Sequence, residues 1–435
     1  MRCSLQEIFA KHFDGYASSR HLHARETRAA WCIRHCHTAV MGQHLLVCPQ
    51  GHFEQIQYHA CRHRSCPRCA AAPRHAWIEA ELQRLLPCPH FHAVFTLPHE
   101  LLPLWAFNRR EMIELLMRSV RQCLLEMLAT PRHGGIVPGL LQALHTWGRD
   151  LSYHPHVHCL VSAGGVDASA SWKPLRRGFL LPLRPLQALL RGKLLGALSR
   201  LLQDSALVLP PSLSPQASIA LIRRLYSKHW NIEIQPPYNA ASGVALYLAR
   251  YVKGGPIPAD RPLFLDTQGF VRMPYTDHRE HRTKTLRLHV HDFIARVLWH
   301  APPSGQQCVR HAGLYNSALK AQHALAVSQL QQGCTPIGPD AVVKQTAFAA
   351  VPTCPTCPTC GQPLQPCFSG MIGSRGSAIS IQMAAQPPPS SISAVHPGPT
   401  RRSNGHPAGQ AGRAPPTSHI LGSARPAWPA GRRST

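Results

Sequence analysis

Acidic residues are scarce in this sequence: 20 Asp and Glu stand against 46 Lys and Arg, which gives a formal net charge of +26 at pH 7. No Asp or Glu follows Asp340, but the eight Lys and Arg beyond it carry only part of the excess, and the first 340 residues keep a charge of +18. The imbalance is therefore not confined to a basic tail. A net positive charge over most of the chain favours a polyanionic partner, and nucleic acid is the first hypothesis.

Long apolar runs are also missing. No stretch of about 18 uncharged apolar residues occurs, which excludes an ordinary transmembrane helix, and the opening MRCSLQEIFAKHF lacks the apolar core of a signal peptide. We therefore expect a soluble, intracellular protein. In a reducing compartment the 16 Cys are expected to bind metal rather than to form disulfides, with a few buried structural thiols as the alternative.

The chain divides into three parts of different composition. Residues 1–86 are rich in Cys and His, and we expect a small zinc-binding, DNA-binding domain there. Residues 87–320 mix strand and helix patterns, so the expected fold class is α+β with a catalytic domain in this part. Residues 321–435 become rich in Pro, Gly, Ser and Ala, and we expect a low-complexity basic tail that is mostly disordered.

Hydrophobic periodicity predicts the elements of the middle part. From Phe91 apolar residues alternate with more polar ones, as in a half-buried strand. Two further strand candidates are LHTW and HVHCLVSAGG, and the turn-favouring Gly164-Gly165 is expected to close the second. Helices are expected over 108–129, 184–209 and 242–253, and the basic stretch 278–300 is expected to pair a strand with a helix.

The first cluster with chemical potential consists of cysteines. Thiolates and imidazoles suit tetrahedral Zn²⁺, which takes four S or N ligands at roughly 2.0–2.3 Å. The expected ligands are Cys36, Cys48, His52, Cys61, Cys66 and Cys69. With Cys32 and nearby histidines there are enough donors for a second zinc, and unrelated free cysteines are the alternative. Three basic residues of this region suit phosphate contact, with a solvated charged face as the alternative for each: Arg62, Arg64 and Arg68.

The second cluster is His154-Pro-His156-Val157-His158. On a strand, His156 and His158 point to the same face while Val157 packs on the other, so both imidazoles are able to ligate one ion. Pairs of this kind are more often surface or core histidines, and His289-Val290-His291 is a second copy. The first copy is favoured because a strong strand pattern leads directly away from it.

The third cluster is Tyr247-Leu-Ala-Arg-Tyr251. Residues four apart share a helix face, so two phenols would present to one phosphodiester site, although helical packing is the commoner explanation. A phenol with a pKa of roughly 10 is a weak nucleophile and needs a metal that polarises the scissile phosphate. Arg250 and Lys253 would add positive charge beside it.

These clusters belong to a set of blocks in a fixed order: CRHRSCPRC, LLPCPHFHAVFTLPHEL, LHTWGRDLSYHPHVHCLVSAGG, YLARYVKGGPI and FIARVLWHAPPSGQQCVRHAGLYNS. Over roughly residues 30–318 the sequence resembles the two-tyrosine, HUH-type transposases that move bacterial insertion sequences by a rolling-circle route. Five separated blocks with compatible spacing make the resemblance specific. It implies an N-terminal zinc domain, then a nuclease domain with a central antiparallel sheet flanked by helices.

The resemblance also implies a site and a reaction. His156 and His158 would hold a catalytic Mg²⁺ or Mn²⁺, and Tyr247 and Tyr251 would be the nucleophiles. Cleavage of single-stranded transposon ends and target DNA would leave a 5′-phosphotyrosine and a free 3′-OH, so that rejoining needs no ATP. Such a protein would work in the bacterial cytoplasm, at the nucleoid.

The sequence departs from the family pattern in three places. No motif identifies a third metal ligand, for which Glu233, Gln235 and Asn239 are candidates. His52 stands near the position where a second Cys is expected, so it is taken to substitute, and the tail beyond about Cys367 resembles nothing in the family. The competing functions are a non-enzymatic zinc-finger DNA-binding protein and a metal-dependent hydrolase that uses water in place of tyrosine.

Overall fold

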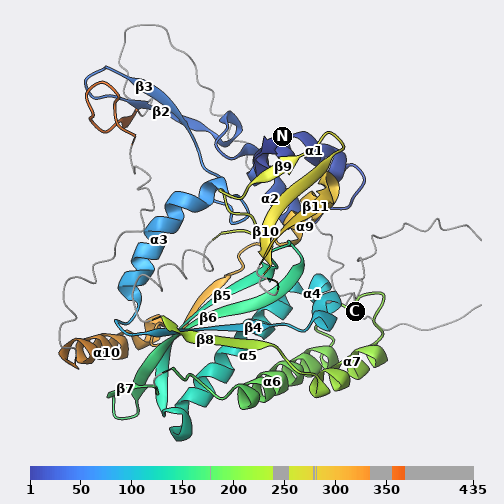
Figure 1. The fold of residues 1–435 in the computed structure, drawn as a ribbon, viewed down its shortest axis with the longest axis vertical. Coiled ribbons are helices and arrows are strands. Elements are labelled where there is room, and N and C mark those ends of the chain that lie inside the picture. Colours follow the sequence, from blue (N-terminus) through green and yellow to red (C-terminus); the bar gives the residue numbers. More distant parts are fainter. Residues whose placement is uncertain (177, 239–253, 278–279, 281, 334–354, 368–435) are drawn as a thin grey trace, which may run out of the picture. The chain divides into compact units, whose positions relative to one another are not determined.

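The structure, a computed structural model, describes residues 1–176, 178–238, 254–277, 280, 282–333 and 355–367 (Figure 1). Within these residues helices are mixed with three antiparallel sheets. The expected α+β class is therefore confirmed. No helix in this part of the chain is long and apolar enough to cross a membrane.

The largest sheet has six strands, with β12, β5, β6, β4 and β8 in that order and β7 paired to β6. Every neighbouring pair in it is antiparallel. The bounds are β4 His90–Thr96, β5 Ile136–Trp147, β6 Tyr153–Asp167, β7 Trp172–Pro174, β8 Ile232–Tyr238 and β12 Val309–Gly313.

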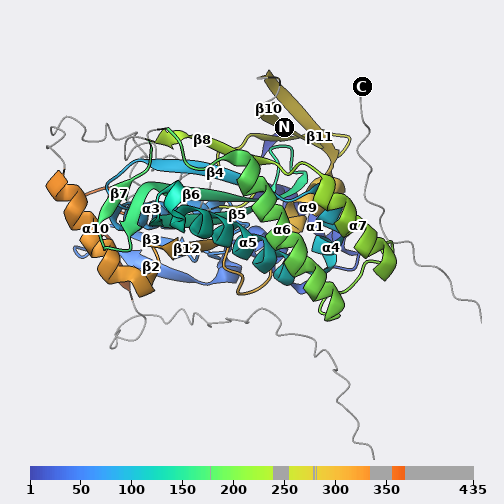
Figure 2. The same cartoon turned by 90° about the horizontal axis from the view of Figure 1, so that it is seen from below.

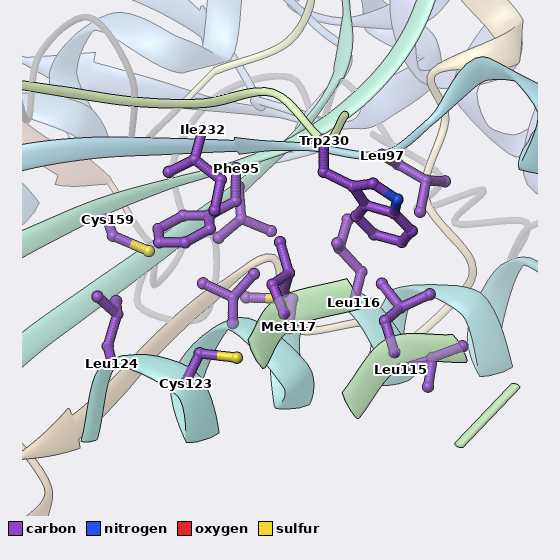
Figure 3. Close-up of a cluster of buried hydrophobic side chains, with 14 of the residues drawn as sticks. Phe95, Leu97, Leu115, Leu116, Met117, Cys123, Leu124, Cys159, Trp230 and Ile232 are labelled. Carbon is purple, nitrogen blue, oxygen red and sulfur yellow. The ribbon is translucent and has the colours of Figure 1, made fainter. Parts of the chain in front are cut away.

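One face of this sheet packs against three helices that follow one another in space, α5 to α6 to α7 (Figure 2). In Figure 3, Phe95 of β4 and Cys159 of β6 lie over Leu116, Met117 and Leu124 of α5. The opposite face packs against α3 and α10. The bounds are α3 Ala71–Arg84, α5 Arg109–Ala129, α6 Leu183–Gln203, α7 Pro215–Ser227 and α10 Lys320–Gly333.

Strand alternation decides which side chains reach which face. On β4 the apolar residues Phe91, Ala93 and Phe95 belong to the core under α5, which confirms the alternation predicted from the sequence. His90 and His92 of the same strand consequently point to the opposite face. On β6 the same rule turns Val157, Cys159 and Val161 toward α5, and His156 and His158 away from it.

Two predicted boundaries were wrong. Gly164-Gly165 does not close β6, which runs on to Asp167. Instead the pair allows close approach within the sheet, because a Cβ on Gly164 would lie 2.5 Å from the Trp172 ring and one on Gly165 would overlap the Val137 carbonyl. The helix expected over 184–209 ends at Gln203, and Ser205 then takes a left-handed φ of 51°. The helix expected over 242–253 lies outside the described residues.

The N-terminal helices α1 Leu5–Ala17 and α2 Ala24–His35 share a core with a distant part of the chain. They pack on α9 and on a four-stranded sheet of order β1-β9-β10-β11. Their core therefore draws residues from well beyond position 86. The bounds are β1 Arg2–Cys3, β9 Leu263–Leu265, β10 Phe270–Asp277, β11 Arg282–His289 and α9 Val290–Trp299, and this last pair confirms the strand and helix expected over 278–300.

A third sheet joins segments from the two ends of the described chain. β2 Gln43–Val47 and β3 Glu54–Tyr58 form a hairpin, and β13 Gln365–Cys367 pairs with the free edge of β2. Two parts of the expected tail thus have regular structure, namely α10 and the segment around β13. The remaining elements are short: α4 Leu102–Phe107, η1 Ala39–Met41, η2 Arg68–Ala70, η3 His99–Leu101, η4 Pro131–His133 and η5 Ser317–Leu319.

Candidate metal centres

Three histidines from two neighbouring strands converge on the sheet face opposite α5. His145 of β5 is the register partner of His156 on β6, and His158 follows two residues later on the same face. One ring nitrogen of each lies within 4.8 Å of the others. All three side chains are buried. The strand predicted from His156 therefore brings the two histidines of the pattern to one point, together with a third that the sequence analysis missed.

Hydrogen bonds indicate which ring nitrogens of His156 and His158 carry protons. His156 Nδ1 donates to the His154 carbonyl at 2.6 Å, so its Nε2 is unprotonated. On the other side, the Glu233 carboxylate accepts from Gln235 Nε2 at 3.1 Å, which turns the Gln235 oxygen toward His92.

The same chain of donors continues from His92 to His158. His92 Nδ1 donates to Gln235 Oε1 at 2.9 Å, and His92 Nε2 then accepts from His158 Nδ1 at 2.9 Å. With the protons assigned in this way, the Nε2 atoms of His156 and His158 both act as acceptors, and they lie 3.0 Å apart. Two lone pairs at that distance repel unless a cation lies beside them.

Burial keeps these imidazoles neutral. It lowers the pKa of His156 to about 4 and lowers the pKa of His158 well below its ordinary value. It also lowers the pKa of His92. A neutral imidazole is the form that ligates a metal. Adjacent ligands about 2.1 Å from an octahedral ion are about 3.0 Å apart, which matches the two Nε2 atoms.

The candidates for a third metal ligand have different positions. Gln235 and Glu233 lie on β8, where Gln235 is opposite His92, so these two residues orient a ligand through His92. His145 is the nearer third donor. Its signal in the sequence was the LHTW strand candidate, which forms the end of β5, where His145 lies on the same face as Leu141 and Ala143. Asn239 lies outside the described residues.

The tyrosine pair and its basic neighbours also lie outside the described residues. These are Tyr247, Arg250, Tyr251 and Lys253. Their assignment remains a prediction from the sequence.

Four of the six predicted zinc ligands form one group. Cys36 at the end of α2 meets Cys61, Cys66 and Cys69, with all four Sγ atoms within 4.8 Å of one another. Cys69 Sγ lies 3.1 Å from Cys36 Sγ and 3.4 Å from Cys61 Sγ. Burial raises the pKa of Cys36 to about 12, so thiolates in this position need a cation beside them. Four convergent thiols without a disulfide fit a closed, structural zinc site.

The other two predicted ligands, Cys48 and His52, belong to a separate group. It is completed by Cys357 and Cys360, from the segment that we had expected to be part of a disordered tail. The sequence analysis missed these two residues because the surrounding composition is rich in Pro and Thr. The available signal was Cys357-Pro-Thr-Cys360-Gly361, which has the spacing of Cys66-Pro-Arg-Cys69.

The predicted phosphate-binding arginines have unequal surroundings. Arg62 is exposed at a φ of 52°. Arg68 donates to Gln6 Oε1 at 2.5 Å and to the Cys36 carbonyl, so it supports the cysteine group. Arg64 lines a pocket with Thr146 and Trp147, the residues directly after His145. Arg64 thus lines a pocket together with residues adjacent in sequence to His145.

Comparisons with known proteins match two parts of the chain to transposase families. A family model described as "Putative transposase" matches residues 139–323, and one described as "Transposase zinc-binding domain" matches residues 8–97. The chain is 31% identical over 323 residues to "Putative transposase y4qJ" of Sinorhizobium fredii (strain NBRC 101917 / NGR234), covering 73% of this chain and 81% of the relative.

A second relative has the same level of similarity. The chain is 31% identical over 310 residues to "Transposase for insertion sequence element IS801" of Pseudomonas savastanoi pv. phaseolicola, covering 70% of this chain and 73% of the relative. No solved structure matches the chain.

Proposed function

Because the chain belongs to the HUH-type, two-tyrosine family of insertion-sequence transposases with an N-terminal zinc-binding domain, we propose that it nicks and rejoins single-stranded DNA through a 5′-phosphotyrosine intermediate. The observation that carries this proposal is the convergence of three buried imidazoles on one sheet face, where the Nε2 atoms of His156 and His158 lie 3.0 Å apart and His145 lies beside them.

The histidine trio fits a divalent cation. His156 and His158 would supply adjacent ligands and His145 a third, while the other positions of an octahedral ion would remain for water and a phosphate oxygen. Three imidazoles without a carboxylate suit Mn²⁺ better than Mg²⁺, which prefers oxygen ligands. Such an ion, when bound, polarises the scissile phosphate.

The tyrosines would carry the covalent step. The phenol oxygen of Tyr247 or Tyr251 forms a bond to phosphorus, the bond from phosphorus to the 3′ oxygen breaks, and the departing oxygen takes up a proton to become a 3′-OH. The number of phosphate ester bonds is unchanged, so a second DNA 3′-OH can reverse the step without ATP. Two tyrosines allow one strand to be held while a second is attacked.

The remaining surface charge would bind the substrate. Arg64, beside the residues that follow His145, would contact phosphate near the trio, whereas Arg62, Arg250 and Lys253 would contribute from the zinc-binding region and the tyrosine segment. Arg68 would also contact phosphate from the zinc-binding region, and in addition it donates a hydrogen bond to the Cys36 carbonyl.

A covalent adduct tests the proposal. A single-stranded oligonucleotide labelled on its 3′ side should become attached to the protein in the presence of Mn²⁺, and the adduct should disappear when both tyrosines are changed, Tyr247→Phe with Tyr251→Phe. Either single change should keep one cleavage step. Cleavage without an adduct would establish a hydrolase that uses water, and binding without cleavage would establish a non-enzymatic DNA-binding protein. An adduct that persists in the double variant would refute the choice of nucleophiles.

A further inference from the structure

The short segment 355–367 pairs with the β2–β3 hairpin, which lies about three hundred residues earlier in the chain. β13 pairs antiparallel with β2, with Gln365 opposite Val47 and Cys367 opposite Leu45. In Figure 1 this segment, orange-red, lies against the blue hairpin of β2 and β3. The hairpin lies inside the matched zinc-binding model, which spans 8–97, whereas residues 355–367 lie outside both matched models.

Each partner contributes a tight turn that presents two potential ligands. In the first, Gly51 N donates to the Cys48 carbonyl at 2.9 Å, and in the second Gly361 N donates to the Cys357 carbonyl at 2.9 Å. Both glycines take a left-handed φ, 75° and 73°, which a residue with a Cβ rarely adopts. Both turns therefore use a left-handed glycine, which lies three residues after Cys48 in the first and four residues after Cys357 in the second. One carries Cys48 and His52, and the other Cys357 and Cys360.

The four donor atoms converge at distances that suit one ion. Cys48 Sγ lies 3.6 Å from Cys360 Sγ and 3.9 Å from His52 Nδ1, and all four atoms lie within 4.8 Å of one another. Zinc bonds of about 2.3 Å to sulfur place tetrahedral neighbours about 3.8 Å apart. A disulfide needs its sulfurs about 2.05 Å apart, so the separation of Cys48 and Cys360 corresponds to a pair of ligands rather than a covalent bond.

Apolar packing alone is too small to hold these turns together. The local core consists of four buried side chains, Leu46, Cys48, Cys357 and Leu364, with Phe53 and Cys360 packed against it. Two of the four are cysteines, and every residue of β3 is exposed. Structures with so little apolar core usually depend on a metal or a disulfide.

We propose that Cys48, His52, Cys357 and Cys360 form a second structural zinc site, which closes the β2–β3 hairpin onto residues 355–367. This site is separate from the group of Cys36, Cys61, Cys66 and Cys69, and it completes the zinc-binding region with a segment from the other end of the described chain. All four ligands are protein groups, so the ion has a structural role and leaves no open position for substrate. The inference does not depend on the proposed DNA cleavage.

Zinc content is the direct test. The full chain, purified without chelator, is compared by elemental analysis with the double variant Cys357→Ser and Cys360→Ser. The variant should contain one zinc ion fewer per chain. Cys367→Ser is the matched control, because Cys367 lies on the same segment but outside the group of four, and it should keep the zinc content of the wild type. A double variant with unchanged zinc content would overturn the proposal.

A pair of truncations and a spectroscopic measurement keep the proposal testable if the double variant fails to fold. A chain ending after Gly333 should lose one zinc, whereas a chain ending after Gly370 should lose none. With Co²⁺ in place of zinc, the visible absorption of a site with three thiolates and one imidazole should disappear from the double variant, while the absorption of the four-thiolate site remains. Survival of both absorptions, or loss of a zinc in the Gly370 truncation alone, would count against the site.

Discussion

The sequence contains His-Val-His twice, and the two copies have different structures. His156-Val157-His158 lies inside β6, with both imidazoles buried on one face and linked to His145 and His92. His289-Val290-His291 straddles the junction of β11 and α9, where His289 is exposed and caps the helix by accepting from His291 N at 3.4 Å.

The difference shows that the pattern gains its chemistry from the backbone around it. Only an uninterrupted strand places residues two apart on one face, and only neighbouring strands supply further donors to that face. The shared feature is the valine, which is buried in both copies, Val157 in the core under α5 and Val290 in the core of the N-terminal helices. A valine between two histidines therefore indicates burial of one face but does not by itself indicate a metal site.

The largest expected effect separates the two copies directly. His156→Ala or His158→Ala should reduce formation of the covalent adduct more than about 100-fold, since each removes a metal ligand at the reacting phosphate. Oligonucleotide affinity should remain within about twofold, because binding depends on distributed positive charge. His289→Ala is the matched control and should keep its activity. Loss of the adduct in His289→Ala but not in His156→Ala would reverse the assignment of the two copies.

A smaller effect is expected from the residues that orient His158. Gln235→Leu interrupts the donor chain from Glu233 through His92, and it should weaken activation by Mn²⁺ about 10–100-fold. Activity should return at high Mn²⁺ concentration, which a general loss of structure would not allow. Gln142→Leu removes a buried glutamine that bonds to Met117 on the opposite face. That control should lower the melting temperature and leave the Mn²⁺ concentration dependence unchanged.

The smallest effect concerns the shared valines. Val157→Ala and Val290→Ala should each lower the free energy of unfolding by about 1–3 kcal/mol, because both leave a cavity in a core. Only Val157→Ala should also raise the Mn²⁺ concentration needed for half activity, since β6 holds two ligands. Equal metal dependence in both variants, measured alongside chemical denaturation, would show that the strand tolerates this cavity without moving the histidines.

Much of the fold was predictable because periodicity is a local property. The alternation from Phe91 and the helix over 108–129 follow from which faces are apolar, and both agree with the structure. The strand ends were less predictable. Gly164-Gly165 has the composition of a turn, yet its lack of side chains makes room for Trp172 of β7 and the backbone of β5, and that contact is not visible in the sequence around it.

The candidate sites show the same division. His156 and His158 were identified because they are adjacent in sequence, whereas His145 and His92 join them only through the pairing of β5 and β4 with β6. Cys357 and Cys360 were missed because their partners, Cys48 and His52, lie far away in the chain and their neighbourhood has the composition of a disordered tail. Two cysteines separated by two residues, such as Cys357 and Cys360, are the pattern in such a tail that indicates half of a metal site.

The pairing of β1 with β9 sets an order for folding during synthesis. Arg2 and Cys3 are register partners of Phe264 and Leu263, and the core of α1 and α2 is completed by α9. At about 5–20 residues per second, a ribosome needs roughly 10–50 s to produce the partners of this first strand. During that interval α1 and α2 lack the part of their native core that α9 and the strands β9 and β10 supply. The nascent α1 and α2 are therefore expected to be clients of ribosome-associated chaperones until α9 emerges.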